Sequence, residues 1–247
     1  MQKTFKASTI VSLIIGSIAI TGLSITANAA DGYLTASQVP NSLKILPLPP
    51  QENSAGQVRD NAIFQDMQAQ EGSARWAQAA VDADLTDEHL GRPFSEVFGL
   101  EINEKNTPTL FSMMQKIRLD SNVTTKSAKQ HYNRTRPFIS MKVATCTPQD
   151  ETTLKSNGSY PSGHTTIGWT YALLLAELRP DRQNEIIQRG YEYGQSRVVC
   201  NMHWQSDVDA GRVIAAAQFA RLQADPQFRK DLKKAKKEIQ HLIKAHK

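Results

Sequence analysis

The sequence predicts an all-α fold, a single-domain helical bundle over residues 31–247, on three observations. Apolar residues recur with the period of a helix along most of the chain after residue 58. Short polar links join these segments, which is typical of a bundle. Runs that favour a strand are limited to 138–143 and 197–199.

The expected elements follow in order along the chain. Residues 31–56 are expected to form an extended arm, because the prolines within 45–50 cannot continue a helix. A polar, glycine-containing loop is expected over 148–159. Helical segments are expected at 62–70, 73–83, 95–100 (a short helix or turn), 107–119, 124–135, 162–178, 180–194, 204–224 and in a basic terminal stretch.

Prolines and one serine mark most of the boundaries between these helices. Pro108 and Pro180 begin helices, because proline suits the first turn. Ser162 precedes a strongly apolar periodic run, which is typical of an N-cap. Pro137 and Pro226 follow helix ends, because the residue before a proline disfavours helical backbone.

Residues 1–30 are expected to be a secretory signal peptide that is removed. Lys3 and Lys6 give a positive start, 10–23 is mostly apolar, and Ala-Asn-Ala at 27–29 suits a cleavage site. The alternative is a membrane anchor, but the apolar run is shorter than the ~20 residues that span a bilayer. No second long apolar run follows, so we expect an exported protein without a membrane span.

Charge is unevenly distributed along the chain, whose net charge is +5 at pH 7. Residues 229–247 hold eight Lys or Arg against two acidic residues, and the body from 30 to 228 is net negative. This pattern predicts a terminal helix with a solvated lysine face. The alternative is a site for a polyanion or a membrane surface. We expect no nucleic-acid partner, because the excess of positive charge lies in the tail.

Cys146 and Cys200 are the two cysteines of the chain. An exported protein meets oxidising conditions, so we expect them to form a disulfide. The alternative is two buried free thiols. A bridge would close a loop worth roughly 4 kcal/mol in the chain-entropy model. It would also tie the segment after Arg136 to the segment that carries Arg197 and His203.

His203 and Asp207 form the first candidate catalytic pair. If a helix begins near His203, Asp207 lies on the same face one turn later. Its carboxylate can then fix the tautomer of the imidazole, leaving the other ring nitrogen free to attack phosphorus. The ordinary alternative is a His–Asp pair on a helix surface.

Pro161-Ser162-Gly163-His164 forms the second segment. The N-terminus of a helix presents free N–H groups to an anion, and glycine allows a close approach. Ser162 can donate its hydroxyl, and His164 can protonate a leaving alkoxide. The ordinary alternative is a capped helix start.

Lys129, Arg136 and Arg197 supply the third part, a set of cations. Lys129 and Arg136 are seven residues apart, so we expect them to point the same way from two turns of one helix. Fixed cations stabilise the charge of a phosphoryl group in transit. Each segment alone has an ordinary explanation, but three compatible segments in one short chain rarely coincide. Together they predict phosphoryl transfer by His203.

These three segments, Lys129-x6-Arg136-Pro137, Pro161–His164 and Ser196-Arg197-x5-His203-x3-Asp207, resemble the signature of the type 2 phosphatidic acid phosphatase superfamily, shared with vanadium haloperoxidases. Residues 75–84, 157–160 and 203–209 also resemble the bacterial class A non-specific acid phosphatases. The resemblance implies an all-helical periplasmic enzyme, often a homodimer. It also implies metal-free hydrolysis, at acidic pH, of phosphomonoesters such as nucleotides and sugar phosphates.

The resemblance assigns the same roles as the residues do. His203 is the nucleophile, Asp207 orients it, and His164 is the acid and then the base. The phosphate would be held by Lys129, Arg136, Arg197, Ser162 and the amide of Gly163. We expect no metal or cofactor, and phosphate or vanadate as the ligand of the site. Phosphotransfer to an alcohol is a possible side reaction of the same intermediate.

Other functions remain open at this point. A vanadium haloperoxidase uses the same set of residues for vanadate, and a phosphate-binding protein needs no general acid. A metal-dependent phosphatase would need clustered carboxylate and histidine ligands, whereas these histidines lie among cations. A lipid phosphate phosphatase would carry several membrane spans, which this sequence does not contain.

Overall fold

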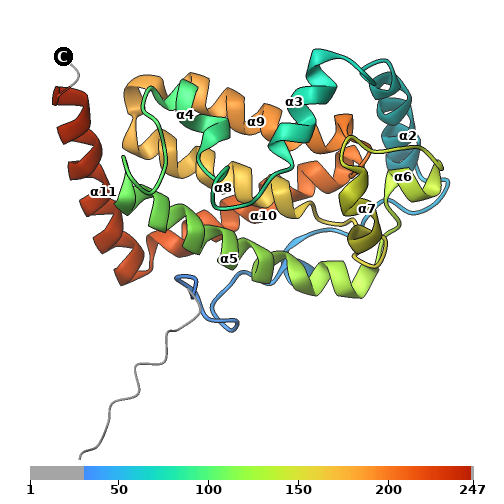
Figure 1. Ribbon diagram of the computed structural model, residues 1–247. Helices are drawn as coiled ribbons and strands as arrows, with labels where there is room; N and C mark the ends of the chain where they lie inside the picture. The colour runs from blue at the N-terminus through green and yellow to red at the C-terminus, as the bar shows by residue number, and fades with distance from the viewer. Residues whose placement is uncertain (1–30, 246–247) are drawn as a thin grey trace, which may run out of the picture.

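The structure, a computed structural model, describes residues 31–245 (Figure 1). Over that range the chain is helical and contains no strand, which confirms the predicted all-α class. The predicted signal peptide lies outside the described residues. The elements are α1 (Ser42–Ile45), α2 (Ala55–Gln68), α3 (Ala74–Asp82), α4 (Arg92–Phe98), α5 (Pro108–Tyr132), α6 (Pro137–Ser140), α7 (Pro148–Leu154), α8 (Gly163–Leu178), the 3₁₀-helix η1 (Pro180–Arg182), α9 (Gln183–Val199), α10 (Gln205–Gln223) and α11 (Pro226–Ala245).

Helix α8 lies at the centre of the bundle, with α5, α9 and α10 packed around it (Figure 1). It is buried on several sides, through residues such as Ile167 and Leu175, as expected for a helix that is apolar all round. Helices α8 and α9 approach closely at two glycines. A Cβ at Gly168 would lie 2.1 Å from the Tyr193 ring, and one at Gly190 would lie 2.4 Å from a side chain of α8. This tight pair fixes the positions of the residues at its ends.

Four helix ends meet at one end of the bundle (Figure 1). The C-termini of α5 and α9 and the N-termini of α8 and α10 lie there, close to the short helices α6 and α7. The predicted site residues lie at or just beyond these four ends. The fold therefore brings together segments that are far apart in the sequence.

The N-terminal arm, residues 31–54, has no regular secondary structure apart from the single turn of α1, and it includes turns at 36–38 and 52–53. The buried carboxylate of Asp120, on α5, accepts hydrogen bonds from the backbone N–H groups of Tyr33 and Leu34, both at 3.1 Å. Farther along, the Tyr160 hydroxyl donates to the carbonyl of Pro47 at 2.9 Å. The arm is thus fixed to the middle of α5 and to the segment just before α8.

Helix α11 packs its apolar side on the core through Phe228, Ala235 and Ile239. Its Glu238 carboxylate accepts from the first N–H groups of α5, at Thr109 and Leu110. The lysines lie on the exposed side, as predicted for a solvated lysine face. Within residues 31–245, no helix is both long enough and apolar enough to cross a membrane.

Several predicted boundaries were wrong. The stretches 107–119 and 124–135 form one helix, α5, which ends at Tyr132 because Asn133 adopts left-handed backbone at φ 38°. Helices α2 and α4 begin earlier than predicted, with Ser54 capping α2 and Pro93 in the first turn of α4. Proline in the first turn is compatible with a helix, so the Arg92-Pro93 pair begins α4 rather than separating two elements.

The loop predicted over 148–159 is helical in its first half. Pro148 begins α7, and Asp150 and Glu151 lie in its first turn, where negative charge favours a helix. The runs 138–143 and 197–199, which favour strands, contribute to α6 and to the end of α9 instead. No neighbouring strand is available to pair with them in the described chain. Val199, at the end of α9, is instead buried against Ala79 and Phe138.

Candidate active site

A cavity of about 560 Å³ opens at the end of the bundle where the four helix termini meet. Six of the eight predicted catalytic and phosphate-binding residues line it. They are Lys129, Arg136, Gly163, His164, Arg197 and His203. The other two, Ser162 and Asp207, are fully buried behind this lining. The structure therefore brings all three sequence segments to one site.

His203 lies in the link between α9 and α10 and is only 3% exposed. The Arg136 Nη1 atom lies 3.1 Å from His203 Nε2. A guanidinium can only donate, so Nε2 accepts and the proton of the neutral ring is on Nδ1. Burial, and then the charges of Arg136, Lys129 and Arg197, lower the pKa of His203 well below its ordinary value. The neutral imidazole thus has its lone pair on Nε2, beside the cations of the cavity.

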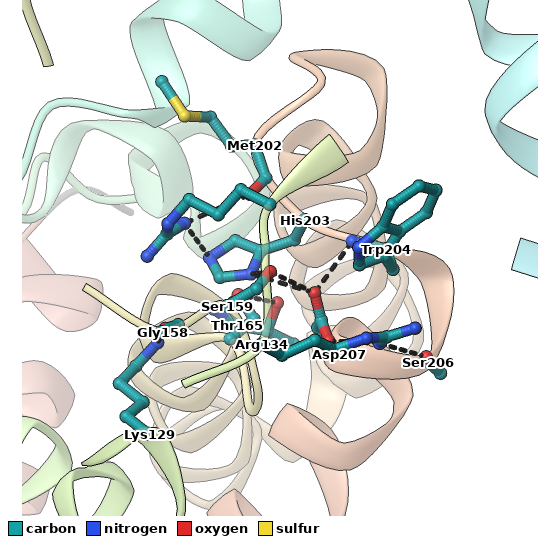
Figure 2. A network of polar contacts seen from close by, with 12 residues as sticks. Lys129, Arg134, Gly158, Ser159, Thr165, Met202, His203, Trp204, Ser206 and Asp207 are labelled. Carbon is teal, nitrogen blue, oxygen red and sulfur yellow. Dashed lines mark hydrogen bonds and ion pairs between the residues drawn. The ribbon is translucent and has the colours of Figure 1, made fainter. Parts of the chain in front are cut away.

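Asp207 interacts with the other side of the His203 ring (Figure 2). Its Oδ2 lies 3.4 Å from His203 Nδ1. The Ser159 hydroxyl lies 3.2 Å from the same Nδ1 and donates a short hydrogen bond to the same Oδ2. Ser159 therefore accepts from the imidazole and donates to the carboxylate. It belongs to the stretch 157–160, which resembles the class A acid phosphatases, but no sequence pattern predicted a role for it.

The predicted geometry of the His203–Asp207 pair was wrong in one respect. Helix α10 begins at Gln205, after His203, with Trp204 as its N-cap. Asp207 lies in the first turn, where its Oδ2 also accepts the Trp204 N–H at 2.9 Å. A carboxylate is favourable at this end of a helix. The two side chains meet because Asp207 reaches back over the helix start, and not because they share a helical face.

Arg134 is a functional candidate that was not predicted from the sequence, although it lies two residues before Arg136. Its Nη1 donates to Asp207 Oδ1 at 2.6 Å (Figure 2). Its Nη2 donates to Asp60 Oδ2, on α2, at 2.8 Å. Both carboxylates are fully buried. The signal that could have revealed it is a second arginine beside a segment already assigned to anion binding.

Lys129 and Arg136 line the same cavity, but from different elements. Lys129 is in the last turn of α5, whereas Arg136 is the N-cap residue of α6 and has extended backbone. The prediction that both residues lie on two turns of one helix was therefore wrong. Lys129 Nζ donates to the Gly158 carbonyl at 2.8 Å. Arg136 Nε donates to the carbonyls of Leu154 and Asn157. These backbone contacts hold both cations in fixed positions.

Arg197 differs from the other cations because none of its guanidinium nitrogens has a hydrogen-bond partner within the part of the chain that the structure describes. The side chain is fully buried and lines the cavity. Burial lowers the pKa of Arg197 to about 10, and burial together with Arg197 lowers that of Arg136 to about 10. Burial and Arg136 also lower the pKa of Lys129 well below its ordinary value. Three crowded cations favour an anion in the cavity.

Ser162 and Gly163 start α8 at the wall of the cavity. The Ser162 Oγ accepts from the backbone N–H and the hydroxyl of Thr165, which confirms the predicted N-cap. Its own hydroxyl proton is not used in these two contacts. A Cβ at Gly163 would meet only Lys129 and Thr125, which also line the cavity, so glycine keeps that space clear.

His164 lies in the first turn of α8 and lines the cavity. Its Nε2 lies 3.0 Å from the carbonyl of Ala83, just after α3. A carbonyl only accepts, so Nε2 carries a proton and Nδ1 is the site that gains or loses one. Burial, and then the charge of Arg197, lower the pKa of His164 well below its ordinary value. An anion beside His164 would oppose this effect.

Cys146 and Cys200 form the predicted disulfide. The bridge joins the loop after α6 to the residue that follows α9. Cys200 also packs with Phe138 and Met202 in a small apolar cluster. The peptide segments that carry Arg136 and His203 are therefore tied together behind the cavity.

Fold and site together define a helical protein with two histidines and three cations around one cavity, a class of site suited to a tetrahedral anion. In residues 31–245, no group of three or more His, Cys, Asp or Glu side chains is arranged to hold a metal ion. The family model of the PAP2 superfamily matches residues 110–229. This match includes all eight predicted catalytic and phosphate-binding positions.

Curated relatives are similar over most of the chain. A non-specific acid phosphatase of Salmonella typhimurium is 48% identical over 200 residues, which cover 81% of this chain and 80% of that protein. A non-specific acid phosphatase of Providencia stuartii is 46% identical over 213 residues, or 86% of each chain. An acid phosphatase of Zymomonas mobilis is 40% identical over 78% of this chain and 73% of its own. The chain therefore belongs to the class A non-specific acid phosphatases of the PAP2 superfamily.

Proposed function

We propose that this chain is an acid phosphatase that hydrolyses phosphomonoesters through a phosphohistidine at His203, without a metal ion. The observation that carries the proposal is the buried Arg197 guanidinium, whose nitrogens lack hydrogen-bond partners among residues 31–245. A buried, uncompensated charge is costly, and a phosphate group held between Arg197, Arg136 and Lys129 would offset that cost. The relatives named acid phosphatases support the same reaction class.

In the first step, the Nε2 lone pair of His203 forms a bond to phosphorus while the phosphorus–oxygen bond to the alcohol breaks. The leaving oxygen takes a proton from His164 Nδ1 and departs as a neutral alcohol. The ring of His203 gains positive charge, which Asp207 offsets through Ser159 and the Nδ1 proton.

In the second step, water attacks the phosphohistidine. His164, now neutral, takes a proton from that water at Nδ1, the nitrogen that does not contact Ala83. The phosphorus–nitrogen bond breaks, its electron pair returns to His203 Nε2, and inorganic phosphate leaves. Throughout both steps, the three cations offset the charge on the phosphoryl oxygens.

The outer part of the cavity supports a broad range of leaving groups. Asn122, Lys126 and Gln130 line it from α5 and are exposed, whereas Arg136 and Arg197 are buried. The phosphate would thus be held at the inner end, with the alcohol part near the mouth. We infer that nucleotides and sugar phosphates are both substrates, and that an alcohol can replace water in the second step.

Export to the periplasm and assembly as a homodimer complete the proposal. The leader-like composition of residues 1–30 supports export. Cell fractionation of the full chain tests it, and retention in the cytoplasm would contradict it. Light scattering of the purified protein tests the homodimer, which rests on the family resemblance alone.

The phosphohistidine is tested by rapid-quench trapping with a ³²P-labelled substrate in the presence of a chelator. We expect a labelled protein that is stable in base and labile in acid, as a phosphorus–nitrogen bond is. His203→Ala should abolish both label and turnover, and Asp207→Asn should lower kcat by about 10² to 10⁴, as for other orienting carboxylates. Vanadate should inhibit as a phosphate analogue. An acid-stable label, or activity lost with the chelator, would overturn the mechanism.

A further inference from the structure

We propose that Arg134 is a positioning residue for this reaction: it holds Asp207 in place for His203, and Asp60 on α2 in turn holds Arg134. The inference rests on the proposed function. None of the three predicted sequence segments gave Arg134 or Asp60 a role. Neither residue lines the cavity, so any effect of either residue on turnover must be indirect.

The contacts of Arg134 fix the orientation of the Asp207 carboxylate (Figure 2). Arg134 Nη1 binds Asp207 Oδ1 at 2.6 Å, while Oδ2 of the same carboxylate faces Ser159 and His203. Rotation of the carboxylate would break the contacts on both sides. An arginine fork that holds one carboxylate oxygen therefore keeps the other oxygen directed to the imidazole.

Arg134 is itself held from the opposite direction. Its Nη2 donates to Asp60 Oδ2 and to Gln57 Oε1, both at 2.8 Å. Asp60 also accepts the backbone N–H of Ser206 at 2.9 Å, at the start of α10. The Arg134 side chain is only 9% exposed, so water competes little for these contacts. Helix α2 thus supports the active site without touching the cavity.

The charges of this group match the reaction. Two carboxylates, Asp60 and Asp207, flank one guanidinium, so the three carry a net charge of −1 when all are ionised. When His203 bonds to phosphorus, its ring gains positive charge, and the set of four becomes neutral. Removing Arg134 would leave two buried carboxylates facing one space, where they repel or share a proton. Either outcome weakens the support for a charged His203.

A second arginine provides a matched control. Arg59 lies beside Asp60 on α2 and forms an ion pair with Asp209 of α10 at 3.1 Å. Arg59 connects α2 and α10, the two helices that the contact of Asp60 with Ser206 also connects, but its side chain is 58% exposed. Exposed pairs of this kind contribute about 1 kcal/mol or less. Arg59→Gln should therefore leave kcat and KM unchanged.

The test is a kinetic double-mutant cycle of Arg134→Met with Asp207→Asn. We expect Arg134→Met to lower kcat by about 10- to 100-fold, the range for groups that orient a reacting ligand. KM and the inhibition constant of vanadate should change by less than about 3-fold, because the three cations of the cavity are untouched. In the Asp207→Asn background, Arg134→Met should lower kcat by less than a further factor of about 3, since Arg134 acts through Asp207.

A purely structural role would give a different result. The proposal would be overturned if the losses in kcat of the two single variants multiply in the double variant. It would also be overturned if Arg134→Met has a normal kcat per folded molecule. If Arg134→Met does not fold, Asp60→Asn replaces it, with an expected loss of about 10-fold and the same non-additivity. The proposed function is tested separately, by measuring turnover in the wild type and its loss in His203→Ala. An inactive wild type would contradict the proposed function, whereas a fully active Arg134→Met would contradict only the role of Arg134.

Discussion

His203 and His164 have opposite tasks but similar surroundings. Burial and the neighbouring arginines lower the pKa of both imidazoles well below the ordinary value near 6.5. The low pKa keeps His203 unprotonated, and so able to attack, in acid. It also means that His164 gains its proton only at low pH or beside a bound anion. Both effects favour turnover in acid.

The pH dependence of kcat/KM should therefore be bell-shaped, with an optimum below about 6.5. The acid limb reports protonation of His203, and the other limb reports loss of the proton from His164. A series of initial rates from pH 3 to 9, at constant ionic strength, measures this. An optimum in the alkaline range would contradict the assigned roles.

The residues that the sequence analysis identified are those whose type and spacing carry the chemistry. His203, His164 and the three cations stand in short patterns that can be read without a structure. Arg134, Asp60 and Ser159 could not be assigned in that way. Arg134 and Asp207 are 73 residues apart, and Ser159 and Asp207 are 48 apart. No local pattern relates such partners, because folding alone brings them together.

The Cys146–Cys200 disulfide acts at the scale of elements. Replacing both cysteines by serine removes a bridge between residues that are 54 positions apart. In the chain-entropy model this costs roughly 4 kcal/mol, or about 10 °C in Tm for a chain of this size. Calorimetry measures the loss, and kcat should fall as well, because His203 follows Cys200 by three residues. Thiol titration of native wild type should find no free thiol. An unchanged Tm in the double variant would contradict the stabilising role.

The contribution of Asp120 to the stability of the fold depends on pH. Burial raises the pKa of Asp120 to about 6, although the N–H groups of Leu34 and Tyr33 oppose that rise. Ionisation of Asp120 is thus costlier in the folded state than in the unfolded state, where its pKa is near 4. The resulting stability is fully present below pH 4 and is lost as the pH rises through about 6.

Asp120→Asn should become more stable relative to wild type as the pH rises from 4 to 7. The change in the Tm difference should be about 5 °C, because asparagine lacks the buried charge. Asp181→Asn is a control of opposite sign, since the hydrogen bond from Arg179 lowers the pKa of Asp181. Its Tm relative to wild type should fall slightly over the same range. A Tm difference for Asp120→Asn that is independent of pH would contradict the assignment.

Helices were easier to predict than their boundaries. The apolar period of α8 and the Ser162 cap fixed that helix almost to the residue, because α8 is buried on several sides. By contrast, α7 is polar and has no buried residue, so no periodicity indicated it. The join between the two predicted halves of α5 is polar at Asp120 and Ser121. Those residues are buried by tertiary hydrogen bonds, which the local sequence does not reveal.

At the scale of the whole molecule, the buried cations of the cavity lower the stability of the ligand-free protein, but they provide the binding site for phosphate. Phosphate should raise the Tm of the protein, because it binds the folded state only. At 100 times its Kd the gain is about 2.7 kcal/mol, or roughly 5–10 °C. Scanning calorimetry with phosphate, against sodium chloride at equal ionic strength, measures the shift. No difference between the two salts would contradict an anion site.

Arg197→Met tests both effects of a buried cation, on phosphate binding and on stability. It should reduce the phosphate-dependent shift in Tm, because one of the three cations is lost. Without phosphate, the variant should be as stable as wild type or more stable, since a buried guanidinium without partners is replaced by an apolar side chain. A full phosphate shift in this variant would exclude Arg197 from the binding site.

The position of α11 has a practical consequence for handling the protein. This helix lies at the end of the bundle opposite α6 and α7, so the C-terminal end of the described chain is far from the cavity (Figure 1). The arm at the other terminus is bound to α5 and contacts Tyr160, next to Ser159. Affinity tags and attachment to a solid support therefore belong at the carboxyl terminus, where its exposed lysines also offer amine groups for coupling.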